Sequence, residues 1–168
     1  MNFSPNVILA IAPGKRELGI AIFAGADLIY VSVKTIRQRK SRRGLLKEIS
    51  GILKKLFESF PVKRVVIKSI SQYQKRSPNL EKIARRIKAE SRKNNLETAE
   101  VTLEQIKLIL GENKTATEKK AFETLLASYP ELERYWSRPN KWQNDYYAFL
   151  FSAVATGAVY LKTRPARD

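Results

Sequence analysis

The stretch VILAIAPGKRELGIAIF, residues 7–23, predicts two apolar strands joined by a tight Pro-Gly turn. The first of these strands ends on Ala12, directly before the turn. A third apolar run, residues 28–33, follows after another short turn. Short turns between apolar runs are typical of an antiparallel meander. We therefore expect three antiparallel strands at the start of the chain, and Gly19 within the second one predicts a bulge or a close backbone approach.

The remainder of the sequence alternates between helical and strand patterns. Apolar residues at helical spacing predict a first helix around residues 45–57 and a second around 79–93. Each helix is followed by a short strand pattern, at 64–68 and at 97–101. Three further helices are expected, two of them opened by capping-box patterns at Thr102 and Thr115 and the last covering about 142–161.

This order of elements predicts an α/β fold. A meander that feeds two strand–helix crossovers gives a mixed five-stranded sheet, with an antiparallel three-strand meander and two parallel strands, flanked by helices. We expect a single domain over residues 1–168, with a short polar tail from about residue 162. In such a sheet Ala12 and Lys68, at the ends of the first and fourth strands, lie side by side.

Two residue types are missing from the composition, and their absence excludes several kinds of chemistry. The 168 residues include no cysteine and no histidine, so disulfides, thiolate metal sites and common zinc sites are excluded, as is a histidine general base. A metal here would have to be a hard ion such as Mg²⁺ or Mn²⁺. The sequence contains no apolar run long enough to span a membrane and no signal-peptide pattern, so we expect a cytoplasmic protein without a membrane partner.

The charge balance points to a polyanionic partner. Lysine and arginine number 32 against 16 acidic residues, a net charge of +16 with a pI near 10.2. A folded domain with this excess repels itself unless it meets polyanions, of which nucleic acid is the commonest. The alternative is a basic protein with no such partner.

Four stretches together resemble the RuvC branch of the RNase H-like superfamily, the Holliday junction resolvases. The first two are Ile8–Gly14, similar to the opening strand of that family, and Val65–Lys68, similar to its fourth strand. The most specific is Thr102–Ala121, which resembles the family's helix–loop–helix, and Asp145–Ala148 resembles the start of its last helix. The resemblance spans roughly Val7 to Tyr160 and implies an RNase H-like fold.

The resemblance also locates four positions at which the family places metal-binding carboxylates. In this sequence they are Ala12, Lys68, Trp142 and Asp145, of which Asp145 alone is acidic. Two-metal phosphodiester cleavage needs several converging carboxylates, and an ammonium at a ligand position repels a cation. We therefore expect no metal cofactor and no two-metal catalysis. Lys68 either pairs with Asp145 or contacts a phosphate.

The alternative is an active enzyme that uses Mg²⁺ or Mn²⁺ with a rearranged set of carboxylates. The substitutes that the sequence offers are Glu17, Asp27 and Glu123, none of which occupies a matched position.

Several basic and polar residues are candidates for nucleic-acid binding. They come from the turn after the first strand, from a basic run before the first helix, from the segment and helix after Lys68, and from the loop of the helix–loop–helix. These candidates are Lys15, Arg37, Arg39, Lys40, Arg42, Arg43, Lys68, Gln72, Tyr73, Lys75, Arg76, Arg85 and Lys114. The aromatic residues crowded between 136 and 151 are expected to serve core or subunit packing rather than base stacking.

Together these observations predict a RuvC-like protein that binds branched or structured DNA, as a homodimer, without cutting it. One alternative is an active Mg²⁺- or Mn²⁺-dependent Holliday junction endonuclease. A basic scaffold that binds RNA or a protein partner is a further alternative, because fold does not fix function.

Overall fold

The computed structural model describes residues 6–37, 41–70, 77–111, 118–136 and 141–164, and for residues 118 and 141–146 it describes the backbone alone. No helix within these ranges has the length and apolar character of a membrane span.

Five strands form one mixed sheet, as the sequence predicts. The strands are β1 (Val7–Pro13), β2 (Glu17–Ala24), β3 (Asp27–Thr35), β4 (Arg64–Lys68) and β5 (Glu97–Val101). Their order across the sheet is β3-β2-β1-β4-β5. β1 to β3 are antiparallel, whereas β4 runs parallel to both β1 and β5. The meander and the two parallel strands are thus confirmed.

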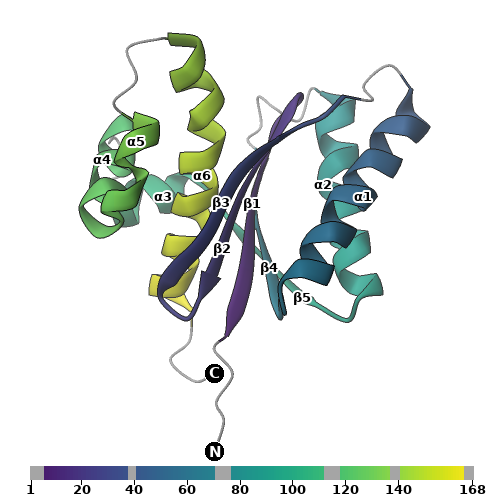
Figure 1. The fold of residues 1–168 in the computed structure, drawn as a ribbon, viewed down its shortest axis with the longest axis horizontal. Helices are drawn as coiled ribbons and strands as arrows, with labels where there is room; N and C mark the ends of the chain where they lie inside the picture. The colour runs from purple at the N-terminus through teal and green to yellow at the C-terminus, as the bar shows by residue number, and fades with distance from the viewer. Residues whose placement is uncertain (1–5, 38–40, 71–76, 112–117, 137–140, 165–168) are drawn as a thin grey trace, which may run out of the picture.

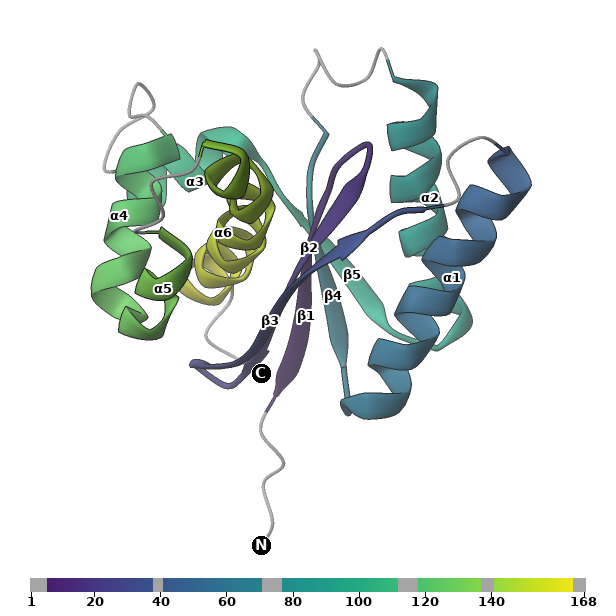
Figure 2. The same ribbon diagram turned by 45° about the horizontal axis from the view of Figure 1, so that its top comes forward.

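Helices cover both faces of the sheet, as Figures 1 and 2 show. One face is covered by α1 (Arg42–Ser59) and α2 (Pro78–Lys93). The opposite face is covered by α6 (Lys141–Thr163), and against it pack α3 (Leu103–Leu110), α4 (Glu118–Ser128) and the short α5 (Glu133–Trp136). The 3₁₀ turn η2 (Pro130–Leu132) packs against α4 and α5. The sequence patterns did not predict η2 and α5.

Capping residues account for the first turns of α3 and α1. Thr102 opens α3 through a capping box, in which its hydroxyl accepts a hydrogen bond from the Gln105 N–H at 3.1 Å, and this prediction is confirmed. The second expected capping box, at Thr115, lies outside the described residues. α1 begins earlier than expected because Ser41 caps it, accepting a hydrogen bond from the Gly44 N–H at 2.8 Å.

The alternation of side chains along β1 and β4 decides which layer each residue faces. Ile8, Ala10 and Ala12 belong to the core on the α6 side, together with Val66 of β4. Leu9 and Ile11 belong to the core on the α1 and α2 side. Because successive side chains of a strand point to opposite faces, Lys68 shares the face of Val66, which is the face that α6 covers.

α6 lies unusually close to β2. A Cβ atom on Gly19 would stand 1.9 Å from the carbonyl oxygen of Phe149, so only glycine leaves room for the helix backbone there. A Cβ atom on Gly14 would stand 2.3 Å from the ring of Phe149, so this glycine makes room for the side chain of the same residue. The predicted close approach at Gly19 is confirmed, whereas the register shift of β2 falls between Ile22 and Phe23. The helix is therefore held at a fixed short distance above the strand ends.

Candidate functional site

Ala12 and Lys68 end two neighbouring strands in the middle of the sheet. β1 and β4 pair in parallel up to Ile11 opposite Ile67, so the next residue of each strand, Ala12 and Lys68, follows in the same register. Both residues line a pocket of about 160 Å³, which we call the strand-end pocket. Its lining is completed by Pro13, Ser69, Ile70, Ala148, Phe149 and Ser152. The expected juxtaposition is confirmed.

Lys68 is half-buried, and its side chain extends toward α6. Its Nζ atom donates a hydrogen bond to the Oγ atom of Ser152 at 3.4 Å. Ser152 is itself buried on α6, and its carbonyl oxygen accepts a 2.7 Å hydrogen bond from the Thr156 hydroxyl. The ammonium group is thus directed toward α6 and partly shielded from water.

The sequence did not identify Ala148, Phe149 and Ser152 as site residues. A signal was present: Phe149 and Ser152 follow Asp145 by four and seven residues, the spacing of one helix face. Asp145 and Trp142 belong to the first turns of α6, and their side chains lie outside the described part of the chain. Pairing of Lys68 with Asp145 therefore stays a prediction.

The described lining of the strand-end pocket does not fit a divalent cation. Mg²⁺ and Mn²⁺ require oxygen ligands, and carboxylates above all. The described lining residues carry no carboxylate and place an ammonium where a cation would lie. Glu17, Asp27 and Glu123 do not line this pocket. Across the described ranges, no group of three or more Asp, Glu, His or Cys side chains comes together.

A groove continues from the strand-end pocket toward α2. Lys68 and Ser69 also line this second depression, of about 340 Å³, to which α2 contributes Glu81, Ala84, Arg85 and Lys88 and β5 contributes Glu100. Lys88 is paired with Glu100 of β5 at 3.0 Å, whereas Arg85 is exposed. Two predicted nucleic-acid-binding residues, Lys68 and Arg85, thus lie along one groove.

A second basic surface lies where α1 meets α2. Arg42, Arg43, Leu46 and Lys47 of α1 and Arg86 of α2 line a depression of about 510 Å³, and none of these described lining residues is acidic. Arg86 lies 3.8 Å from Glu90 and 3.4 Å from the Ser50 hydroxyl, which leaves its positive charge only partly compensated. The fold therefore joins basic residues that are more than forty positions apart in the sequence.

The other candidates are more scattered. Lys15 is exposed in the turn after β1, and the backbone N–H of exposed Arg37 donates a 2.8 Å hydrogen bond to Glu48. The remaining seven candidates lie outside the described residues: Arg39, Lys40, Gln72, Tyr73, Lys75, Arg76 and Lys114.

Three helix N-termini lie at the same end of the molecule as the strand ends. In Figure 1, β1 and β4 rise toward the top of the view, and α1, α2 and α6 all start there and run downward. The N-terminus of a helix carries a partial positive charge and free N–H groups. This end of the molecule, which we call the strand-end face, combines these dipoles with the basic side chains and is suited to phosphate groups.

Solved structures with this arrangement are known. In sequence, the chain matches no family model and no curated protein. In structure, it matches Thermus thermophilus RuvC in complex with a Holliday junction substrate, with a TM-score of 0.73 and 15% identity over 92% of both chains. A second Thermus thermophilus RuvC structure gives a TM-score of 0.70 and 14% identity, covering 93% of this chain and 95% of that one.

The fold is that of RuvC, an RNase H-like fold.

A more distant resolvase extends the RuvC-like match. The yeast mitochondrial Holliday junction resolvase Ydc2 superposes with a TM-score of 0.62 and 9% identity, covering 95% of this chain and 81% of that one. The TM-scores of these matches establish the shared fold, and at identities this low they establish nothing beyond it. The sequence-based resemblance to RuvC-type resolvases is confirmed at that level.

Proposed function

We propose that the protein binds branched or structured DNA at its strand-end face and does not cleave it through metal ions. The observation that carries this proposal is the position of Lys68. Its ammonium lies in the pocket between the ends of β1 and β4, beside Ala12 and hydrogen-bonded to Ser152.

Electrostatics opposes a divalent cation beside this ammonium. Two unit charges of like sign about 4 Å apart repel by about 4 kcal/mol at an effective dielectric of about 20, and a divalent ion doubles that repulsion. A carboxylate ligand offsets such a cost, but Ala12 and Lys68 offer none. The same ammonium attracts a phosphate by a similar amount, so loss of a metal site and gain of a phosphate site have one physical cause.

The surrounding charges support a nucleic-acid ligand. Exposed Arg85 adds a positive charge to the groove beside Lys68, which Glu81 and Glu100 also line, and the cluster at α1 and α2 adds four more cations. The structurally similar Thermus thermophilus RuvC is in complex with a Holliday junction, which is a branched DNA. We infer branched DNA as the ligand from this likeness and a homodimer as the binding form.

A binding and cleavage assay on one substrate tests the proposal. A labelled four-way junction is incubated with the protein in EDTA, in Mg²⁺ and in Mn²⁺, and both binding and strand integrity are followed. We expect binding in all three conditions, weakening steeply with salt, and intact strands throughout. Sedimentation of the free protein and of the complex reports whether a dimer binds.

Two outcomes contradict the proposal. Metal-dependent cleavage that disappears in Asp145→Ala would identify an active nuclease with a rearranged site. Failure of any nucleic acid to bind at moderate salt would favour a scaffold with a protein partner.

A restoring variant tests the role of the two strand-end residues directly. Ala12→Asp combined with Lys68→Glu places two carboxylates at the strand ends. We expect this double variant to unfold at a lower temperature in EDTA than in Mn²⁺, because the ion relieves repulsion between the new carboxylates. The unmodified protein is expected to unfold at the same temperature in both. An equal Mn²⁺ response in both proteins would show that metal binding does not depend on these positions.

A further inference from the structure

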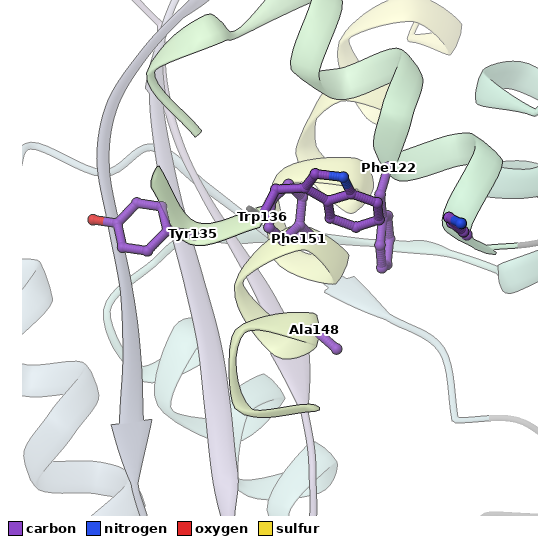
Figure 3. Close-up of a pocket in the computed structure, with 6 residues that line it drawn as sticks. Phe122, Tyr135, Trp136, Ala148 and Phe151 are labelled. Atoms are coloured by element: carbon purple, nitrogen blue, oxygen red, sulfur yellow. The ribbon is translucent and has the colours of Figure 1, made fainter. Parts of the chain in front are cut away.

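A second pocket lies beside the strand-end pocket, on the outer side of α6. It measures about 320 Å³ and is lined by Lys119, Phe122, Tyr135, Trp136, Ala148 and Phe151. We call it the aromatic pocket. These residues come from α4, α5 and α6, and Figure 3 shows Trp136, Phe151 and Phe122 gathered at its centre.

The three central rings form a rigid wall. Trp136 meets Phe151 edge-to-face with centroids 5.2 Å apart, and Phe122 stacks on Phe151 at 5.4 Å. Phe122 and Phe151 are buried, whereas Trp136 is only half-buried. The wall therefore keeps its shape through the buried rings and offers part of the indole to an incoming group.

Positive charge lies at the edge of this apolar surface. Lys119 lines the pocket and is exposed, and Arg134, which is not itself a lining residue, places its guanidinium 4.7 Å from the ring centroid of the lining residue Tyr135. An apolar protein segment would gain no favourable interaction from this positive charge. A flat aromatic group attached to an anion uses both the rings and the charge.

The aromatic pocket adjoins the strand-end pocket through one small residue. Ala148 of α6 lines both pockets, so the aromatic pocket and the Lys68 side meet at this small residue. A nucleotide has the matching layout, with a phosphate next to a planar base.

We propose that the aromatic pocket receives an unpaired nucleobase of the nucleic acid whose backbone lies against Lys68. This inference rests on the proposed function and deepens it, because it gives the protein a preference for nucleic acids with a base outside the helical stack. Stacking of a base on an aromatic side chain tolerates any base, so the preference is for unpaired structure rather than for sequence.

The test compares two labelled DNA duplexes of similar length, one fully paired and one with a single bulged adenine. We expect the bulged duplex to bind about tenfold more tightly, the size of one base–aromatic stack. Trp136→Leu, which keeps an apolar side chain but removes the indole face, is expected to lose this preference while still binding the paired duplex. Ala148→Leu, which narrows the connection between the pockets, is expected to reduce the preference as well.

The controls separate stacking from folding and from self-association. Trp136→Phe keeps a ring and is expected to retain most of the preference, and Tyr30→Leu, a matched aromatic change on β3, is expected to leave it unchanged. Thermal unfolding verifies that each variant is folded. A preference that persists in both Trp136→Leu and Ala148→Leu overturns the inference. So does a Trp136→Leu variant that loses self-association but keeps the preference, because the pocket then serves a protein contact.

The outcomes for the unmodified protein distinguish this inference from the proposed function. If neither duplex nor a four-way junction binds, the proposed function itself fails. If the paired and bulged duplexes bind equally and with strong salt dependence, nucleic-acid binding stands and only the base pocket is refuted.

Discussion

Replacement of Lys68 by glutamine tests the phosphate-binding role of the strand-end pocket. The change removes one positive charge and retains a polar side chain that can still hydrogen-bond Ser152. If the ammonium contacts a phosphate, Lys68→Gln weakens junction binding at every salt concentration and also weakens its dependence on salt.

The size of the effect follows from the half-buried position of Lys68. A charge pair about 4 Å apart is worth about 1 kcal/mol in water and about 4 kcal/mol at an effective dielectric of about 20. A half-buried lysine lies between these limits, so we expect a loss of about 2 kcal/mol, or roughly thirtyfold in Kd. Loss of one phosphate contact also lowers the slope of log K against log salt by about 1.

The matched control is Lys162→Gln. Lys162 is an exposed lysine on the same helix that faces Lys68, but it lies at the far end, near the C-terminus of α6. Both variants change the net charge equally, so any effect of overall charge cancels. The assay is a titration of a labelled four-way junction at several salt concentrations. Equal affinities and equal slopes for the two variants would refute the assignment of Lys68 to a phosphate.

Three further predictions concern stability and titration. Gly19→Ala is expected to lower the free energy of unfolding by about 3 kcal/mol, because the new methyl group collides with the α6 backbone. Gly51→Ala, on the open face of α1, is expected to raise the free energy of unfolding by about 0.5–1 kcal/mol, and thermal melts of both variants measure the difference. Thr102→Ala removes the α3 capping box and is expected to cost about 1 kcal/mol in urea unfolding, and an unchanged midpoint would contradict that role. Burial raises the pKa of Tyr30, but hydrogen bonds from Lys34 and Ser32 and the Lys34 charge outweigh it and hold the pKa below 10.0. Because this pKa is lower in the folded state, the phenolate stabilises the fold above the unfolded pKa, and this stabilisation is lost as the pH falls through the folded pKa. Lys34→Met is expected to raise the pKa of Tyr30, measured by phenolate absorbance, and to remove the stabilisation at alkaline pH.

The mixed five-stranded sheet and the adjacency of β1 and β4 could be predicted from local patterns. Apolar runs and turn residues report directly on strands, and the crossover rules then leave few ways to connect them. The short α5 could not be predicted, because a helix of four residues has no periodicity to detect. Its position matters, since α5 carries Trp136 into the aromatic pocket.

The candidate site was predictable only in part. Ala12 and Lys68 follow from strand ends and register, which the sequence encodes locally. Ser152 could not be assigned a partner from the sequence, because its contact with Lys68 depends on the height of α6 above the sheet. That height depends on the absence of a side chain at Gly19, and the effect of a missing atom on a distant helix has no local signal.

The strand-end positions have a consequence for how readily the chemistry of this fold can be exchanged. Ala12 and Lys68 come after the last residues that pair β1 with β4, but each still pairs on its other side, Ala12 with Gly19 of β2 and Lys68 with Val101 of β5. Backbone groups make these pairs, so the pairing does not require a particular side chain. The side chain at half-buried Lys68 can therefore differ in charge while the strand pairing is kept, whereas a charged side chain at Ala12 must be accommodated at a buried position. In a fold of this kind, ligand binding and catalysis can be changed separately. For protein design, this means that a catalytic carboxylate and a phosphate-binding lysine are alternative side chains at the same backbone position.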